Sequence, residues 1–306
     1  MKITVIGSTN IDLTLHVDHF PLPGETIASR SFGQANGGKG ANQAVTCARL
    51  GADVTFVTAL GADSYAPALL SDFAADGIDT SRIVMRTSVN TGLAFILIDS
   101  TGENNITIAA GANATVSPED IENCRAAIED ADVLVMQAEI PYESVKAAAA
   151  IARRAGTKVL YNPAPVLAVD DDMMAMTDIL VVNENEASTL AGLQFDGGNC
   201  RDIAAILHNR GAALVVITLG SKGAYAFDGA TELHAEAFKV KAVDTVGAGD
   251  TFCGALAVAC GKDGRVDADA LRFASAAAAL SVQRHGAQPS VPTLAETEQF
   301  LKIQTL

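Results

Sequence analysis

The chain has 306 residues, of which 49% are hydrophobic and 19% are charged, so it buries a sizeable core and is neither disordered nor fibrous. Its 21 Lys and Arg residues against 36 Asp and Glu residues give a net charge of -15, which repels nucleic-acid phosphates and anionic lipids. We expect neither nucleic acid nor membrane as a partner, although a nest of backbone N–H groups or a divalent cation can still hold a small anion.

No apolar signal region precedes the first strand-like run, at residues 3–7 (ITVIG). The most apolar stretch, residues 253–260, is about half of the roughly 18 residues that suggest a membrane helix. We therefore expect a soluble, cytoplasmic protein.

The cysteines form no CxxC pair and the histidines no HExxH motif, which argues against disulfides and zinc sites. We interpret the cysteines as reduced and mostly buried: Cys47, Cys124, Cys200, Cys253 and Cys260.

Two segments predict pairs of strands, at residues 11–32 and 93–108, with turn sequences (PLPGE and STGEN) between the strands. Inserted into an α/β chain, such pairs indicate a small separate sheet. We expect this sheet to act as a lid, formed by insertions at about residues 11–34 and 91–110 of a single domain that spans residues 1–306.

Beyond the lid segments, short β-branched runs alternate with Ala-rich segments of helical period. In order, we expect a helix capped by Ser117, a strand at residues 133–136, a helix at 144–155, strands at 158–161, 179–182 and 213–218, helices at 248–259 and 268–283, and a last helix capped by Thr293. This alternation is typical of an α/β fold in which crossover helices connect the strands of a parallel sheet.

Residues 33–40 (GQANGGKG) differ from a Walker A loop at one position, because Gly40 stands where a hydroxyl would bind magnesium. The segment before them is not a buried strand. What remains is a glycine turn that leads into a helix over residues 41–50. Either the glycines only form a tight turn, or they let a hydroxyl-rich ligand approach the backbone, with Lys39 and Asn42 supplying hydrogen bonds.

Residues 244–250 (DTVGAGD) contain two glycines, Gly247 and Gly249, before a predicted helix. The first N–H groups of that helix and its positive dipole end would form an anion hole. Asp250 either caps the helix or accepts a proton from a hydroxyl that attacks a phosphoryl group held there. The dinucleotide motif GxGxxG fails here, because Phe252 stands at its last glycine.

Two further polar segments follow strand-like runs. Residues 183–186 (NENE) come after a buried strand, at the edge where open α/β sheets bind ligands. Their oxygens suit Mg²⁺, although the start of a helix also favours acidic residues. Residues 7–12 (GSTNID) offer Asn10 and Asp12, an amide and a carboxylate suited either to paired sugar hydroxyls or to a capped loop.

The segments at residues 37–44 (GGKGANQA) and 244–250 resemble the two signature segments of the ribokinase-like (PfkB-type) sugar kinases. The resemblance covers nearly the whole chain, through residues 7–10, 162–165, 183–186 and 286–290. Both signatures, in this order and at this separation, are highly specific for the family. The resemblance implies a three-layer α/β/α fold with a mostly parallel sheet and a β-lid, ATP as phosphoryl donor, Mg²⁺, and K⁺ as a monovalent activator.

The resemblance also implies roles for single residues. Asp250 would be the catalytic base, and the anion hole would be formed by Gly247, Ala248 and Gly249. The sugar would be held by Asn10, Asp12, Gly38, Lys39, Asn42 and Glu139. The nucleotide would contact Asn183, Thr218, Gly220, Ser221, Gly223 and Gly249, with Glu186 reaching Mg²⁺ through water. The monovalent cation would lie among Asp244, Val246, Ser281, Arg284, Gly286 and Ser290.

The expected reaction is ATP-dependent phosphorylation of the primary hydroxyl of a pentose, D-ribose at O5, because Asn10, Asp12 and residues 286–290 are most similar to the ribose kinases of the family. One alternative is a kinase of the same family that acts on deoxyribose, a ketohexose or a nucleoside. Another is a non-catalytic sugar sensor on the same fold. The intact Asp250 speaks against a sensor, which has no need of a base.

The lid strands also predict an assembly. Residues 93–98 (LAFILI) are apolar on both faces of a strand, and residues 11–17 supply another apolar row. If one face covers the sugar, the other exposes an apolar patch, unless the lid packs flat on its own domain. We expect a homodimer joined lid to lid, centred on the outward-facing members of Leu13, Leu15, Phe95 and Leu97.

Overall fold

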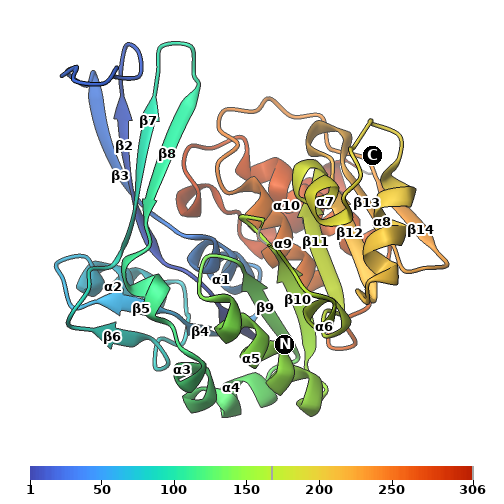
Figure 1. Cartoon of the computed structure of the whole chain (residues 1–306). Coiled ribbons are helices and arrows are strands. Elements are labelled where there is room, and N and C mark those ends of the chain that lie inside the picture. Colours follow the sequence, from blue (N-terminus) through green and yellow to red (C-terminus); the bar gives the residue numbers. More distant parts are fainter. Residues whose placement is uncertain (167, 305–306) are drawn as a thin grey trace.

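An eight-stranded sheet forms the centre of the computed structural model, which describes residues 1–166 and 168–304 (Figure 1). The strand order is β14 (Glu232–Ala235), β13 (Ala224–Phe227), β12 (Leu214–Thr218), β11 (Ile179–Asn183), β10 (Lys158–Asn162), β9 (Val133–Gln137), β1 (Lys2–Ile6) and β4 (Asp53–Val57). Neighbours from β12 to β4 are parallel, whereas β13 and β14 add antiparallel strands at one edge. The expected mostly parallel sheet is therefore confirmed.

Helices cover both faces of this sheet. Because successive side chains of a strand point to opposite faces, Val133 and Val135 enter one core, and Leu134 and Met136 enter the other. The first core includes α1 (Lys39–Arg49), α2 (Ala66–Ala75), α9 (Ala248–Ala259) and α10 (Ala268–Ser281), against which α11 (Leu294–Ile303) packs. The second includes α3 (Pro118–Asn123), α4 (Arg125–Glu129), α5 (Tyr142–Ala155), α6 (Asp171–Ala175), α7 (Glu184–Ala191) and α8 (Cys200–Asn209). The fold has the expected three layers.

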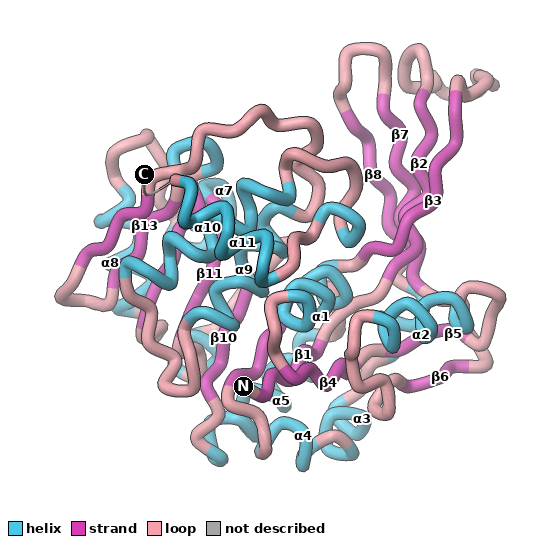
Figure 2. Tube along the Cα trace, turned by 180° about the vertical axis from the view of Figure 1, so that it is seen from behind, coloured by secondary structure: helices cyan, strands magenta, loops and turns pink. Residues whose placement is uncertain are grey.

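A second, four-stranded sheet projects from the layered body, as both views of the chain show (Figures 1 and 2). Its order is β3 (Ser31–Gly37), β2 (Asn10–His16), β7 (Gly92–Ile98) and β8 (Asn104–Ala109). The β2–β3 and β7–β8 pairs are antiparallel, and β2 and β7 join them in parallel. The two predicted strand pairs therefore exist and form one small sheet. A separate two-stranded pair consists of β5 (Ala59–Gly61) and β6 (Val84–Arg86).

The glycine-rich segment differs from the prediction in two respects. Residues 33–37 belong to the edge strand β3 rather than to a turn, and α1 begins at Lys39 instead of residue 41. The turn is reduced to Gly38, whose φ of 89° favours glycine. A Cβ on Gly38 would lie 2.8 Å from the backbone nitrogen of Asn10, so the close contact between the start of β2 and this turn also requires glycine.

Two predicted helix starts are confirmed. Ser117 Oγ accepts a hydrogen bond from the N–H of Asp120, and Thr293 Oγ1 accepts one from the N–H of Glu296. In each helix the acidic side chain returns a bond to the N–H of the capping residue, which completes a capping box.

The five cysteines are free thiols, as expected, and all but Cys200 are buried. Burial raises the pKa of Cys47 and Cys253, so these thiols stay protonated and serve as small apolar side chains. Among residues 1–166 and 168–304, no helix is both long and apolar enough to cross a membrane.

Candidate active site

Two predicted site residues, Asn183 and Thr218, lie at the carboxyl ends of parallel strands, at the edge where α/β sheets commonly bind ligands. Asn162 ends β10, Asn183 ends β11 and Thr218 ends β12. A polar cavity of about 120 Å³ lies beside them, and its lining includes Lys39, Asn162, Asn183, Glu186, Thr218, Gly247, Gly249 and Asp250. Residues predicted separately to bind sugar, nucleotide and metal therefore meet around one space.

The start of α9 forms one wall of the polar cavity. Gly247 is its N-cap, with a φ of 75°, and a Cβ there would lie 2.9 Å from that of Ala287. Gly249 is the second residue of α9, which begins at Ala248. Ala248 N–H bonds to Thr245 O, and Thr251 N–H bonds to Gly247 O. The N–H groups of Gly249 and Asp250 lie between them and have no intrahelical acceptor, which suits an anion.

Asp250 is buried and does not cap α9, because no side chain caps this helix. Its Oδ2 accepts a hydrogen bond from Asn42 Nδ2 at 2.9 Å, and its Oδ1 accepts one from Gln43 Nε2 at 3.0 Å. The helix-cap alternative is therefore wrong. Two oriented amides hold the carboxylate at the cavity wall, and because a carboxylate has about four acceptor sites, it can still accept a proton or a further hydrogen bond.

Lys39, the first residue of α1, lines the same polar cavity. The negative charge of Asp250 is the main cause that raises the pKa of Lys39, and Glu139 adds to it. A cation at this position keeps its proton over the physiological range and offsets part of the acidic charge around the cavity.

Asn183 and Glu186 form a capping box at the start of α7. Asn183 Oδ1 accepts from the N–H of Glu186, and Glu186 Oε2 accepts from the N–H of Asn183, both at 2.9 Å. The helix-start alternative is thus correct, and it leaves Glu186 Oε1 available beside the polar cavity. Burial raises the pKa of Glu186. Within residues 1–166 and 168–304, no three His, Cys, Asp or Glu side chains gather as a metal cage.

Two of the predicted sugar residues, Asn10 and Glu139, lie beside a second cavity. Glu139 Oε2 accepts hydrogen bonds from Ser8 Oγ and from the N–H of Lys39, the latter at 3.0 Å. Asn10 and Glu139 line a cavity of about 300 Å³ that includes Ile108 of β8. The bond between Lys39 and Glu139 therefore links this cavity with the polar one beside Asp250.

Asp12 lies on β2, where it pairs with Ala35 of β3 and its carboxylate lies close to Gly37. A Cβ on Gly37 would lie 2.2 Å from Asp12 Oδ2, so glycine leaves room for the carboxylate. Burial, followed by the charges of Glu139 and Asp250, raises the pKa of Asp12 to about 6. Three carboxylates near one another favour a ligand rich in hydroxyl donors.

Sequence reasoning missed Asn113, which fixes the end of the Asn10 segment. Asn113 Nδ2 donates to Thr9 O at 3.0 Å and to Asn10 Oδ1 at 2.8 Å, and its Oδ1 accepts from the N–H of Thr9. The only signal in the sequence is an amide within an Ala- and Gly-rich run, which does not reveal a partner some hundred positions away. Gln43 was missed for the same reason, although it lies inside a signature segment.

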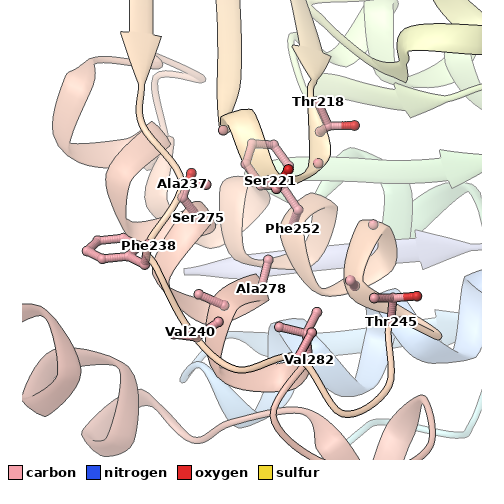
Figure 3. Close-up of a pocket in the computed structure, with 16 residues that line it drawn as sticks. Thr218, Ser221, Ala237, Phe238, Val240, Thr245, Phe252, Ser275, Ala278 and Val282 are labelled. Carbon is pink, nitrogen blue, oxygen red and sulfur yellow. The ribbon is translucent and has the colours of Figure 1, made fainter.

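A larger, mostly apolar cavity of about 330 Å³ adjoins the polar one (Figure 3). It contains the predicted residues Thr218, Gly220, Ser221, Gly223, Ala248 and Gly249. It also contains side chains that were not predicted, among them Phe238, Val240, Phe252, Ala278 and Val282. Both cavities include Thr218 and Gly249. A single ligand with an apolar ring at one end and negative charge at the other therefore fits across them.

The segments predicted to hold a monovalent cation lie side by side. Asp244 Oδ2 accepts from the N–H of Gly286 at 2.9 Å, and the N–H groups of Val243 and Asp244 donate to Val282 O. Ser281 and Ser290 are buried, with their hydroxyls bonded to nearby carbonyls. Carboxylate, hydroxyl and carbonyl oxygens are suitable ligands for a hard cation.

Val246 and Arg284 contribute no side chain to these oxygens. Val246 is half-exposed and only its N–H bonds to Asp244. The guanidinium of Arg284 bonds to Glu296, which lowers the pKa of Glu296 to about 2. Val246 and Arg284 can therefore contribute to the predicted cation site only through their backbone oxygens.

Comparison with known proteins places this geometry in context. The family model for pfkB family carbohydrate kinases matches residues 1–294. Ribokinase from Staphylococcus aureus (strain COL) is 42% identical over 303 residues, which cover 97% of this chain and 99% of that protein. Deoxyribokinase from Salmonella typhimurium is 35% identical over 305 residues, covering 99% of both. The structure of Arabidopsis thaliana ribokinase complexed with ribose and ATP matches with a TM-score of 0.90 and 32% identity, covering 98% of each chain.

Proposed function

This chain belongs to the pfkB family of carbohydrate kinases, and we propose that it transfers the γ-phosphoryl group of ATP to the primary hydroxyl of a pentose, D-ribose at O5. The similarity to ribokinases supports the choice of sugar, and the ribose and ATP complex of one relative supports both substrates. The observation that carries the proposal is Asp250, a buried carboxylate at the start of α9, held by two amides and facing the polar cavity.

The nucleotide spans the two adjoining cavities. Its adenine ring lies in the apolar cavity among Phe238, Val240 and Val282, and its phosphates extend past Gly249 into the polar cavity. The N–H groups at the start of α9 bind the γ-phosphoryl oxygens, where negative charge develops during transfer. Gly247 and Gly249 carry no side chain that would block this approach.

The chemical step needs positioning and one proton acceptor. The O5 hydroxyl oxygen of the sugar forms a bond to the γ-phosphorus, while the bond from that phosphorus to the β,γ-bridging oxygen breaks. ADP leaves with the electron pair of the broken bond. The proton of the hydroxyl passes to a carboxylate oxygen of Asp250.

Magnesium fits the polar cavity as a partner of the nucleotide. Glu186 and Asn183 offer oxygens at one side of the cavity, and Mg²⁺ commonly binds through few protein groups and several waters. When bound, the ion neutralises charge on the β- and γ-phosphates. Lys39 supplies further positive charge from α1.

A monovalent cation, K⁺, fits between the segments at residues 243–247 and 281–290. Asp244 bonds to the N–H groups of both Val246 and Gly286, so this carboxylate ties the loop before α9 to the second segment. A cation held there by oxygen ligands would stiffen the loop that ends in Gly247.

The sugar lies between α1 and the small sheet. Asn10 and Asp12 reach it from β2, Glu139 from the loop after β9, and Gly38, Lys39 and Asn42 from the turn and helix that follow β3. Because β2, which supplies Asn10 and Asp12, belongs to the projecting sheet, we infer that this sheet acts as a lid on a single domain and excludes water during transfer.

The same sheet supports a homodimer. Strand register places Leu13 opposite Phe95 and Leu15 opposite Leu97, so all four lie on one face, with Asp12 on the other. Phe95 is 43% exposed, and Phe32, on the same face, is 63% exposed. An apolar face of this kind is typical of an interface between copies of a chain.

A panel of sugars tests the proposed substrate. ADP release is measured with ribose, 2-deoxyribose, fructose and adenosine as acceptors, and we expect the highest kcat/KM with ribose. Deoxyribose is the strongest competitor, given the deoxyribokinase relative, but its missing hydroxyl leaves a buried polar group unpaired. Equal or higher kcat/KM with any other sugar contradicts the proposal, and no ADP release with any sugar would favour a sensor.

A further inference from the structure

A chain of buried amide side chains ends at the carboxylate of Asp250. Gln43 Nε2 donates to Asp250 Oδ1 at 3.0 Å and to Asn162 Oδ1 at 3.2 Å. Gln43 Oε1 accepts from Gln137 Nε2 at 2.7 Å. Both glutamines are 0% exposed, and neither lines the cavity that contains Asp250. They therefore act on this site only through their hydrogen bonds.

Each amide in the chain has one orientation that satisfies its neighbours. Asn162 Nδ2 donates to Val181 O at 2.9 Å, which turns its Oδ1 toward Gln43. Gln137 presents its NH₂ group to the oxygen of Gln43. Gln43 consequently directs both of its N–H bonds to Asn162 and Asp250. Half a turn of this amide would place its oxygen against a carboxylate and a carbonyl, and its nitrogen against the NH₂ group of Gln137.

The side-chain oxygen of Gln137 shows that packing alone does not explain this residue. Gln137 Oε1 has no hydrogen-bond partner among the described residues, and a Cβ on Gly7 would lie 2.0 Å from it. An unpaired buried oxygen is unfavourable, and an apolar side chain of similar length would fill the site without it. The hydrogen bond that Gln137 donates to Gln43 explains why an amide side chain occupies this position.

We propose that Gln43 and Gln137 are positioning residues for phosphoryl transfer, in which Gln137 and Asn162 together favour one orientation of Gln43, and Gln43 holds Asp250 Oδ1. The inference rests on the proposed role of Asp250 as the base. With one acceptor site of each oxygen occupied, the remaining lone pairs of Asp250 point toward the attacking hydroxyl. A rotated carboxylate misplaces this acceptor and slows transfer, while the substrates still bind through other residues.

Two substitutions of Gln137 separate orientation from packing. Gln137→Glu keeps the size, but an ionised carboxylate only accepts hydrogen bonds, so Gln43 rotates and turns its oxygen toward Asp250. We expect kcat to fall on the order of 10²-fold near pH 8. Gln137→Met removes the donor and leaves Gln43 bound to Asn162 and Asp250, so kcat should fall less than about tenfold. KM for sugar and ATP should stay within about threefold in both.

The pH profile adds a readout that a packing defect would not change. A protonated carboxyl is again a donor to Gln43, and burial favours the protonated form. The kcat of Gln137→Glu relative to the parent should therefore recover as the pH falls from about 8 to about 6. The ratio for Gln137→Met should not change with pH. Equal losses in both variants at every pH, or a rise in KM with unchanged kcat, would overturn the inference.

Two further variants cover failure to fold and failure of the premise. If Gln137→Glu does not fold, Gln43→Met removes the bond to Asp250 directly. This variant should lower kcat at least about tenfold with sugar binding by calorimetry retained, and a smaller loss of kcat overturns the inference. Asp250→Asn tests the premise. Near-parental turnover in that variant refutes both the proposed function and the positioning role. If Asp250→Asn is inactive but Gln137→Glu and Gln137→Met lose kcat equally, only the positioning role is refuted.

Discussion

Gln288 Nε2 donates to Asn42 Oδ1 at 3.3 Å across 246 positions of the sequence, and Asn42 Nδ2 donates to Asp250 Oδ2 at 2.9 Å. Gln288 belongs to the segment proposed to hold the monovalent cation, where its backbone oxygen accepts from Arg49 Nη1 at 2.6 Å. One oxygen of the proposed base is thereby connected to the cation segment through two side-chain amides. These two bonds connect that segment to Asp250 by a route that includes neither substrate.

Gln288→Leu should lower kcat about two- to tenfold, because Asn42 loses the donor that orients its amide. The bond from Arg49 uses the backbone of Gln288, so the local loop should persist. Steady-state kinetics with saturating ribose and ATP check this. Gln283→Leu is the matched control, since Gln283 follows α10 and its Nε2 bonds to Ala279 O of that helix rather than to Asn42. Equal losses of kcat in the two variants would show that the hydrogen bond between Gln288 and Asn42 does not affect turnover.

Asp250→Asn keeps the size of the side chain and removes the base, so turnover should fall on the order of 10² to 10⁴-fold. Sugar binding measured by calorimetry should be retained. Asp269→Asn is a control, because Asp269 lies in the first turn of α10 but is exposed and outside the site. A fall in kcat of less than about tenfold, with binding retained, would remove Asp250 from the role of base.

Asp12→Asn should remove a pH-dependent loss of stability. The pKa of Asp12 is raised from 3.8 to about 6 in the folded chain. Between these values the folded chain binds more protons at this site than the unfolded chain, so the free energy of unfolding falls as the pH rises toward 6 and then levels off. The variant loses no proton there.

Thermal unfolding across this range checks the expectation for Asp12. The Tm of Asp12→Asn relative to the parent should increase between about pH 4 and pH 6 and stay constant above it. The exposed Asp269→Asn provides the reference for general charge effects. A Tm difference that does not change with pH would mean that burial and the acidic neighbours do not raise the pKa of Asp12 in the folded chain.

K⁺ should raise activity over Na⁺ or a bulky organic cation, because it would order the loop that ends in Gly247. Asp244→Ala should lose this response, since its carboxylate bonds to N–H groups of both adjoining segments. A titration of K⁺ into potassium-free enzyme measures the effect. Asp228→Ala, in the turn between β13 and β14, is the control. Indifference of the parent enzyme to K⁺ would remove this site from the proposal.

Sedimentation at micromolar concentration should show a dimer that Phe95→Glu weakens, because a charge would enter the apolar face formed with Leu13, Leu15 and Leu97. Ile106→Glu is the matched control, since register places Ile106 with Ile96 on the opposite face, 51% exposed. Dissociation by Ile106→Glu alone would assign the interface to that face. A monomeric parent protein would contradict the dimer.

Periodicity and punctuation along the chain were enough to predict the layered architecture. The helix at residues 248–259 agrees with α9 at both ends, and Ser117 and Thr293 cap the helices that they were expected to cap. These features depend on neighbours within a few positions, so local sequence contains their causes. The start of α1 was predicted two residues late, because the pairing of residues 33–37 with β2 is a contact between strands rather than a local preference.

The partners of Asp250 were decided only by tertiary structure. The signature segments marked Asp250 as a base or a helix cap, and the fold excludes the cap by directing its oxygens to Asn42 and Gln43. Gln137 and Gln288 reach that pair from β9 and from the cation segment, over 94 and 246 positions respectively. A buried amide carries no signal of its partner in a single sequence, because the hydrogen bond that it makes depends on where distant strands and helices meet.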